Sequence, residues 1–155
     1  MLRRISTLSF IPANIDAGLL ALRIGAFVSL FIKHGFEKVF TFSQMTATMP
    51  DPLHIGQVPS LILAMTGDGI CTVLIVIGLA TRLAALFEFG VLFVAWAFTH
   101  HFMFMGHRAD HGEVIWLYLT ALIAIFLAGP GRYSVDALLE KDSVVSHQMP
   151  AHQVP

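Results

Sequence analysis

The sequence predicts an all-α protein built as a transmembrane four-helix bundle. Of its 155 residues, 56% are hydrophobic and only 12% are charged, about half the charged fraction of a soluble domain. In residues 61–105, two apolar runs of helical length are separated by a turn of three residues. Because so short a turn leaves no chain for a crossover, the two helices must be antiparallel neighbours. We therefore expect a membrane hairpin at the centre of the fold.

Four segments are predicted to span the membrane. A helix rises about 1.5 Å per residue, so about 20 residues cross the ~30 Å hydrocarbon core. The predicted spans are residues 16–36, 61–79, 83–105 and 113–130. The last has a short uncharged centre and stops at the helix-ending sequence Gly129-Pro130-Gly131. Asp16 is expected to cap the first helix.

The remaining segments are predicted as loops and tails. Residues 1–15 begin like a signal peptide, but Pro12 precedes any long apolar run, so the first span is expected to be an uncleaved insertion signal. Residues 41–60 are rich in proline and predict the longest loop, with a short interfacial helix in Phe40–Met45. Residues 137–155 are expected to form a disordered tail.

The distribution of basic residues predicts the orientation. Four spans place both termini on the same side of the membrane. That side carries five basic residues, namely Arg3, Arg4, Arg82, Arg132 and Lys141. The other side carries three, namely Lys33, Lys38 and Arg108. This favours a multi-pass protein of the cytoplasmic (inner) membrane with short cytoplasmic N- and C-terminal tails. The net charge of −1 argues against nucleic-acid binding.

Three groups of motifs follow one another in order. They are Arg23 with His34-Gly35-x-Glu37-Lys38, then Gly67-Asp68 with Gly78-Leu79-Ala80-Thr81-Arg82, and finally Glu113 with Gly129-Pro130-Gly131-Arg132-Tyr133-Ser134-Val135-Asp136. This order resembles the DoxX family of small integral membrane proteins, although the family more often carries Glu at the position of Asp68. The resemblance implies a four-helix membrane bundle. Since some members belong to membrane oxidoreductases such as thiosulfate:quinone oxidoreductase, it also implies a membrane subunit or accessory of a quinone-linked complex, with quinone as the cofactor.

Ionisable side chains at membrane depth cost ~3 kcal/mol each and usually face the bundle interior in pairs. Arg23 and Glu88 are predicted at equal depth and are the expected ion pair, whereas Asp68 either pairs with Arg23 or stays protonated. The candidate intramembrane polar site for a quinone or a proton consists of Arg23, His34, Glu37, Lys38, Asp68, Glu88 and Glu113. The alternative is that these charges only fix helix packing. The protein would then be a non-catalytic membrane scaffold for partner proteins.

The histidines give a weaker signal. His107 and His111 are four residues apart, a spacing that suits a metal on a helix, but Gly106 and Gly112 bracket them and the ligand set is incomplete. They are the candidate metal ligands, although the favoured interpretation is histidine at a wet membrane boundary. Beyond the lipid bilayer, the expected partner is a protein of a redox complex or a second copy of this chain. Whether the protein is an enzyme is left open.

Overall fold

The computed structural model describes residues 12–102 and 112–148, with side chains described as far as residue 143. The first long helix comprises α2 (Ile15–Leu30), the π-helical segment η1 (Phe31–Gly35) and α3 (Phe36–Phe40). A short helix, α4 (Phe42–Met45), follows at its end. The second long helix comprises α5 (Gln57–Met65), the π-helical segment η2 (Thr66–Cys71) and α6 (Thr72–Ile77).

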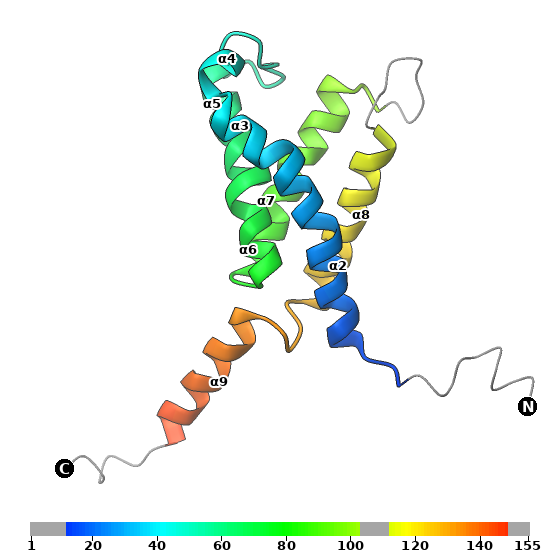
Figure 1. Ribbon diagram of the computed structural model, residues 1–155, viewed down its shortest axis with the longest axis vertical. Coiled ribbons are helices and arrows are strands. Elements are labelled where there is room, and N and C mark those ends of the chain that lie inside the picture. Colours follow the sequence, from blue (N-terminus) through cyan, green and yellow to red (C-terminus); the bar gives the residue numbers. More distant parts are fainter. Residues whose placement is uncertain (1–11, 103–111, 149–155) are drawn as a thin grey trace, which may run out of the picture.

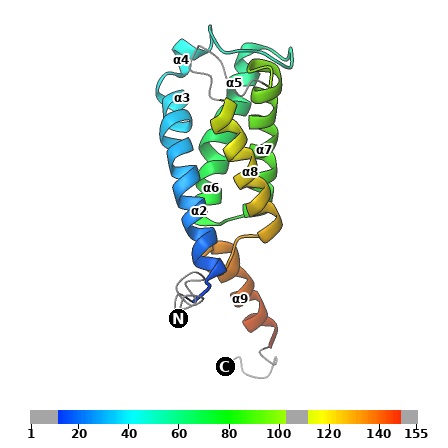
Figure 2. The same cartoon turned by 90° about the vertical axis from the view of Figure 1, so that its right-hand side faces the viewer.

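The second half of the bundle runs back alongside the first (Figure 1). The third long helix comprises α7 (Thr81–Val94) and the π-helical segment η3 (Ala95–Thr99). The fourth is α8 (Gly112–Ala128), and α9 (Val135–Gln148) extends below the bundle (Figure 2). The described part of the chain contains helices and no strand, so the prediction of an all-α bundle is confirmed.

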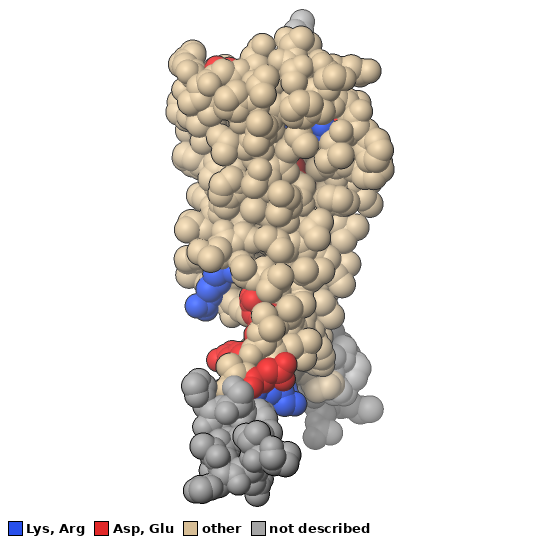
Figure 3. Space-filling view, turned by 90° about the vertical axis from the view of Figure 1, so that its left-hand side faces the viewer, with Lys and Arg blue, Asp and Glu red and all other residues tan. Residues whose placement is uncertain are grey.

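The helices have the length and composition of membrane spans. Among the described residues, three are long and apolar enough to cross a bilayer: Ile15–Phe40, Gln57–Ile77 and Thr81–Thr99; Gly112–Ala128 is a shorter apolar helix. On the face shown in Figure 3, charged side chains gather near the end that bears α9, and the surface above them is almost free of charge. This band of uncharged surface is what a bilayer requires.

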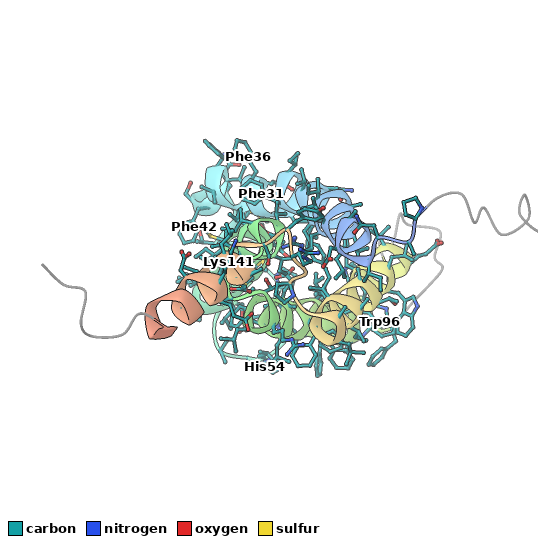
Figure 4. The ribbon with its side chains drawn as sticks, turned by 90° about the horizontal axis from the view of Figure 1, so that it is seen from below. Phe31, Phe36, Phe42, His54, Trp96 and Lys141 are labelled. Carbon is teal, nitrogen blue, oxygen red and sulfur yellow. The ribbon has the colours of Figure 1, made fainter. Side chains whose placement is uncertain are left out.

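Helix packing places the four spans around one core. α2 packs against α6 and α8, whereas α7 packs against α6, η2 and α8, so α2 and α7 lie diagonally opposite each other, as the view from below shows (Figure 4). The fully buried apolar side chains at the centre come from all four spans: Phe27, Leu61, Ile75, Ala85, Leu122 and Ile125. The antiparallel hairpin predicted in residues 61–105 is present in the described residues, with α5, η2 and α6 as one half and α7 and η3 as the other; residues 103–105 lie outside the described part.

The residues after α8 fold back under the bundle and close its lower end. We call residues 129–136 the closing block. In it, the backbone oxygen of Tyr133 accepts a hydrogen bond from the buried Arg23 guanidinium, and the amide N–H of Arg132 donates to Asp16 at 2.8 Å. The Asp136 carboxylate accepts hydrogen bonds from the amides of Ala80 and Thr81 at 2.7 and 3.0 Å. Asp136 therefore caps α7 from a distant part of the chain.

Two local predictions are wrong. Asn14, not Asp16, caps the first helix, through a 3.0 Å hydrogen bond from the amide of Ala17; Asp16 is occupied by the closing block instead. The tail predicted as disordered from residue 137 is helical as far as Gln148. The reason is local, because Ser134 provides an N-cap by accepting from the amide of Ala137 at 3.2 Å. Residues 1–11 and 149–155 lie outside the described part.

Removal of the Asp136 carboxylate is expected to destabilise the fold in a pH-dependent manner. Burial opposes ionisation, but hydrogen bonds from Thr81 and Ala80 outweigh it and lower the pKa of Asp136. Because the pKa of Asp136 is lower in the folded state, its carboxylate stabilises the fold at any pH above the unfolded-state pKa of about 3.9. That stabilisation is lost as the pH falls through the folded-state pKa. Asp136→Ala should therefore cost about 0.5–2 kcal/mol at neutral pH and much less in acid, as measured by denaturant unfolding in detergent.

The exposed Asp142 on α9 provides the matched control. Asp142→Ala should leave the free energy of unfolding unchanged across the same pH range. A difference between Asp136→Ala and wild type that did not shrink on acidification would contradict capping by the ionised carboxylate.

Candidate functional site

Three charged side chains from three different spans meet inside the upper half of the bundle. Lys38, Asp68 and Glu88, which we call the charged cluster, expose only 7%, 6% and 0% of their surface. The Lys38 ammonium lies 2.5 Å from Oδ2 of Asp68 and also donates to the backbone oxygen of His34 at 3.2 Å. The cluster thus joins the end of the first helix to η2 through a buried ion pair.

Glycines let the helices approach closely enough for this pair to form. A Cβ atom on Gly35 would overlap the backbone oxygen of Asp68, so η1 and η2 touch through their main chains. A Cβ atom on Gly67 would lie 2.5 Å from Oε2 of Glu88. Both positions lie in π-helical segments, which are frequent at functional sites in helices. The close approach of the helices at Gly35 and Gly67 is therefore as necessary for the site as its charged side chains.

Glu88 is the least compensated member of the cluster. Its Oε2 atom borders Gly67, the residue that precedes Asp68 in η2. Among the described residues, no donor reaches either carboxyl oxygen of Glu88, nor Oδ1 of Asp68. Two buried carboxyl groups therefore face each other while a single described cation, Lys38, contacts one of them.

The structure unites only part of the predicted site. Lys38, Asp68 and Glu88 meet, and His34 joins them through its backbone oxygen. Glu37 and Glu113 are exposed. His107 and His111 lie outside the described residues, and the described part has no group of three or more metal-binding side chains.

The predicted Arg23–Glu88 ion pair is wrong. Arg23 instead points to the closing block and donates to the backbone oxygen of Tyr133. The prediction compared only depth along each helix, whereas α2 and α7 are diagonal in the bundle. Diagonal helices are separated by the core that lies between them.

The partner of Asp68 was also missed. Lys38 follows the predicted end of the first span at residue 36, and the partner predicted for Asp68 is Arg23. The helix actually continues to Phe40, and side chains on a helix tilt toward its N-terminus. The ammonium of Lys38 consequently reaches back into the bundle. The signal that could have shown this is the absence of a helix-ending residue between Gly35 and Phe40.

An apolar cavity of about 440 Å³ lies beside the charged cluster. It is formed between α5, α7 and η3 beneath residues 49–53, and the side chains on its walls include Leu63, Ala64, Leu86, Phe87, Val91 and Val94. Its polar lining residues are Ser60 and Thr99. Val91 also packs against the Gly67 position that borders Glu88. The cavity and the charged cluster are therefore separated by a single layer of residues.

Asp51 holds the loop that covers this cavity. Its carboxylate accepts hydrogen bonds from Oγ of Ser60 at 2.7 Å and from the amides of Ile55 and Gly56 at 3.0 and 2.7 Å. The hydrogen bond from Ser60, helped by those from the two amides, lowers the pKa of Asp51. The carboxylate is thus charged at neutral pH and ties residues 51–56 to the start of α5.

These features define a class: a small helical membrane protein with ionisable groups buried in its bundle. The DoxX family model matches residues 18–101, which is more than half of the chain. The chain therefore belongs to the DoxX family, as the ordered motifs predicted. Neither a curated protein nor a solved structure matches the sequence.

Proposed function

We propose that this protein is the small membrane subunit or accessory of a quinone-linked oxidoreductase complex, and that the apolar cavity holds the quinone. The supporting observation is the position of the cavity next to the charged cluster, because Val91 lines the cavity and packs against the Gly67 position that borders Glu88. Its volume falls within the range of small-molecule sites. An apolar lining with few polar groups suits a flat, uncharged ring that carries an apolar tail.

Each part of the site has a separate task in this proposal. The cavity walls bind the ring and the tail, and the loop held by Asp51 excludes water from above. The charged cluster acts electrostatically on the bound ring across the layer of residues that separates it from the cavity. Quinone chemistry also requires electrons, which a protein partner in the complex would supply.

Gly90 offers a way to fill the cavity without touching the charged cluster. Gly90 lines the cavity, and a Cβ atom there would meet nothing within 4 Å. Gly90→Leu is expected to occupy the space and to weaken binding of a short-tailed benzoquinone or naphthoquinone by about tenfold or more, which needs only about 1.4 kcal/mol. Saturable quenching of tryptophan fluorescence in detergent would measure the binding.

Gly25→Leu is the matched control, because Gly25 is also an exposed helical glycine with open space around it. It should bind quinone as the wild type does. Equal affinity for quinone in the Gly90→Leu variant and the wild type, or no saturable binding at all, would rule out the cavity as the quinone site.

A second candidate, the non-catalytic scaffold, is favoured by α9. This helix extends away from the bundle (Figure 1), and Leu138 and Leu139 are 61% and 55% exposed. Two adjacent exposed leucines are the kind of surface that a protein partner covers. The scaffold predicts that changing both leucines to serine abolishes cross-linking to a partner, whereas Gly90→Leu has no effect on it.

The proposed orientation keeps both termini in the cytoplasm. Arg82 and Arg132 are exposed at the end of the bundle that carries the closing block, which agrees with the tendency of basic residues to remain inside. The quinone cavity would then open toward the outer half of the cytoplasmic membrane.

A further inference from the structure

We propose that Asp68 and Glu88 share one exchangeable proton, which makes the charged cluster a proton-binding site within the membrane. The proposal does not depend on a quinone, because it concerns the resting charge of the bundle interior. It rests on three observations: the charge balance of the cluster, the hydrogen-bonding groups left without partners, and the burial of Glu88.

The charge balance comes first. With all three groups ionised, the cluster would carry one positive and two negative charges in a site where Glu88 has no exposed surface. An unpaired charge buried in a low-dielectric interior is strongly destabilising. One added proton makes the cluster neutral, with the Lys38–Asp68 ion pair beside an uncharged Glu88.

The oxygens of Glu88 and Asp68 that lack hydrogen bonds also indicate a proton between these two side chains. An ionised carboxylate can only accept hydrogen bonds, whereas a protonated one also donates. Both oxygens of Glu88 and Oδ1 of Asp68 lack a donor among the described residues, and Oε2 of Glu88 borders Gly67, the residue next to Asp68. A proton on Glu88 would donate to Oδ1 of Asp68 and give that oxygen the hydrogen bond that it lacks.

The surroundings contain few other groups that could titrate in place of this pair. The first helix brings Lys38 and His34, and η2 brings Asp68 and Cys71. α6 and η3 carry no titratable side chain. The titratable side chains of α8 are Glu113, which is exposed, and Tyr118, whose hydroxyl lies 3.0 Å from Oγ of Ser29. His34, whose backbone oxygen contacts Lys38, is therefore the remaining ionisable residue that a test must distinguish from the pair.

Infrared spectroscopy of the full chain in nanodiscs tests the proposal directly. A protonated carboxylic acid has a carbonyl stretch apart from the carboxylate bands. We expect this band at neutral pH in the wild type and its loss in Glu88→Gln. Glu37→Gln, which changes an exposed glutamate in α3, should retain the band.

A stability measurement provides a second readout that His34 cannot mimic. Unfolding releases the shared proton, so the equilibrium constant for unfolding of the wild type should increase about tenfold per pH unit relative to Glu88→Gln between about pH 5 and 7. The amide of the substituted side chain donates to Asp68 at any pH, so this variant should fold. A titration of His34 would affect the wild type and the variant alike.

Two results would overturn the proposal. One is a wild-type spectrum without a carboxylic acid band at neutral pH. The other is a wild-type stability that depends on sodium concentration and has the same pH dependence as Glu88→Gln, which would mean that a metal cation and not a proton balances the pair.

Discussion

Lys38→Met is expected to lower the free energy of unfolding by about 3–5 kcal/mol, the usual cost of removing one partner from a buried ion pair. Lys38 is the described cation that contacts the charged cluster, and its ammonium is 2.5 Å from Asp68. Methionine keeps most of the length of the side chain, so the loss reports the charge and not a cavity. Denaturant unfolding in detergent, followed by tryptophan fluorescence, measures the effect.

Two controls separate the ion pair from simple helix effects. Lys33 is an exposed lysine on the same helix, and Lys33→Met should change stability by no more than about 0.5 kcal/mol. Combining Lys38→Met with Asp68→Asn should recover much of the loss, because no unpaired charge remains at that position. If Lys38→Met proved as mild as Lys33→Met, the cluster would not depend on its cation.

Gly78→Ala is expected to be the second most damaging change, with a loss of about 2–4 kcal/mol. Gly78 has a φ of +76°, and a Cβ atom there would overlap Nη1 of Arg23 and approach Cα of Ser134 to 3.0 Å. Its backbone oxygen also accepts from the amide of Asp136 at 2.8 Å. The substitution should therefore displace the closing block, and limited proteolysis after residue 128 should become faster.

The matched control is again a glycine with open surroundings. Gly25→Ala meets nothing within 4 Å in the middle of α2 and should stabilise the helix by roughly 0.5–1 kcal/mol. Similar stability and similar proteolysis for the two variants would show that the contact between Arg23 and the closing block adds little.

The class of fold was predictable because long apolar runs separated by short polar turns leave few alternatives in a membrane. The short turn predicted at residues 80–82, for example, required the α6–α7 hairpin; in the structure the connection is residues 78–80. The same hydrophobic pattern carries no information about helix neighbours, which is why Arg23 was paired with Glu88 across the diagonal of the bundle. Neighbour order depends on how side chains of all four helices fill one core.

The candidate site was predictable by residue type and not by geometry. Burial of Asp68 and Glu88 followed from their positions in apolar runs. The contact of Lys38 with Asp68 required knowledge of a continuous helix through residue 40 and of the close approach at Gly35. The apolar cavity was not foreseen, because it depends on how the loop at Asp51 folds over α5 and α7. Such contacts between distant segments leave no periodic trace in a sequence.

The capping of α7 by Asp136 has a consequence for biosynthesis. The amides of Ala80 and Thr81 depend on a carboxylate 56 and 55 residues further along the chain. At about 5–20 residues per second, the ribosome needs roughly 3–11 s to synthesise that interval. Throughout this time the nascent α7 carries amide groups without their final acceptor. The cap of α7 can therefore form only after residue 136 has been synthesised.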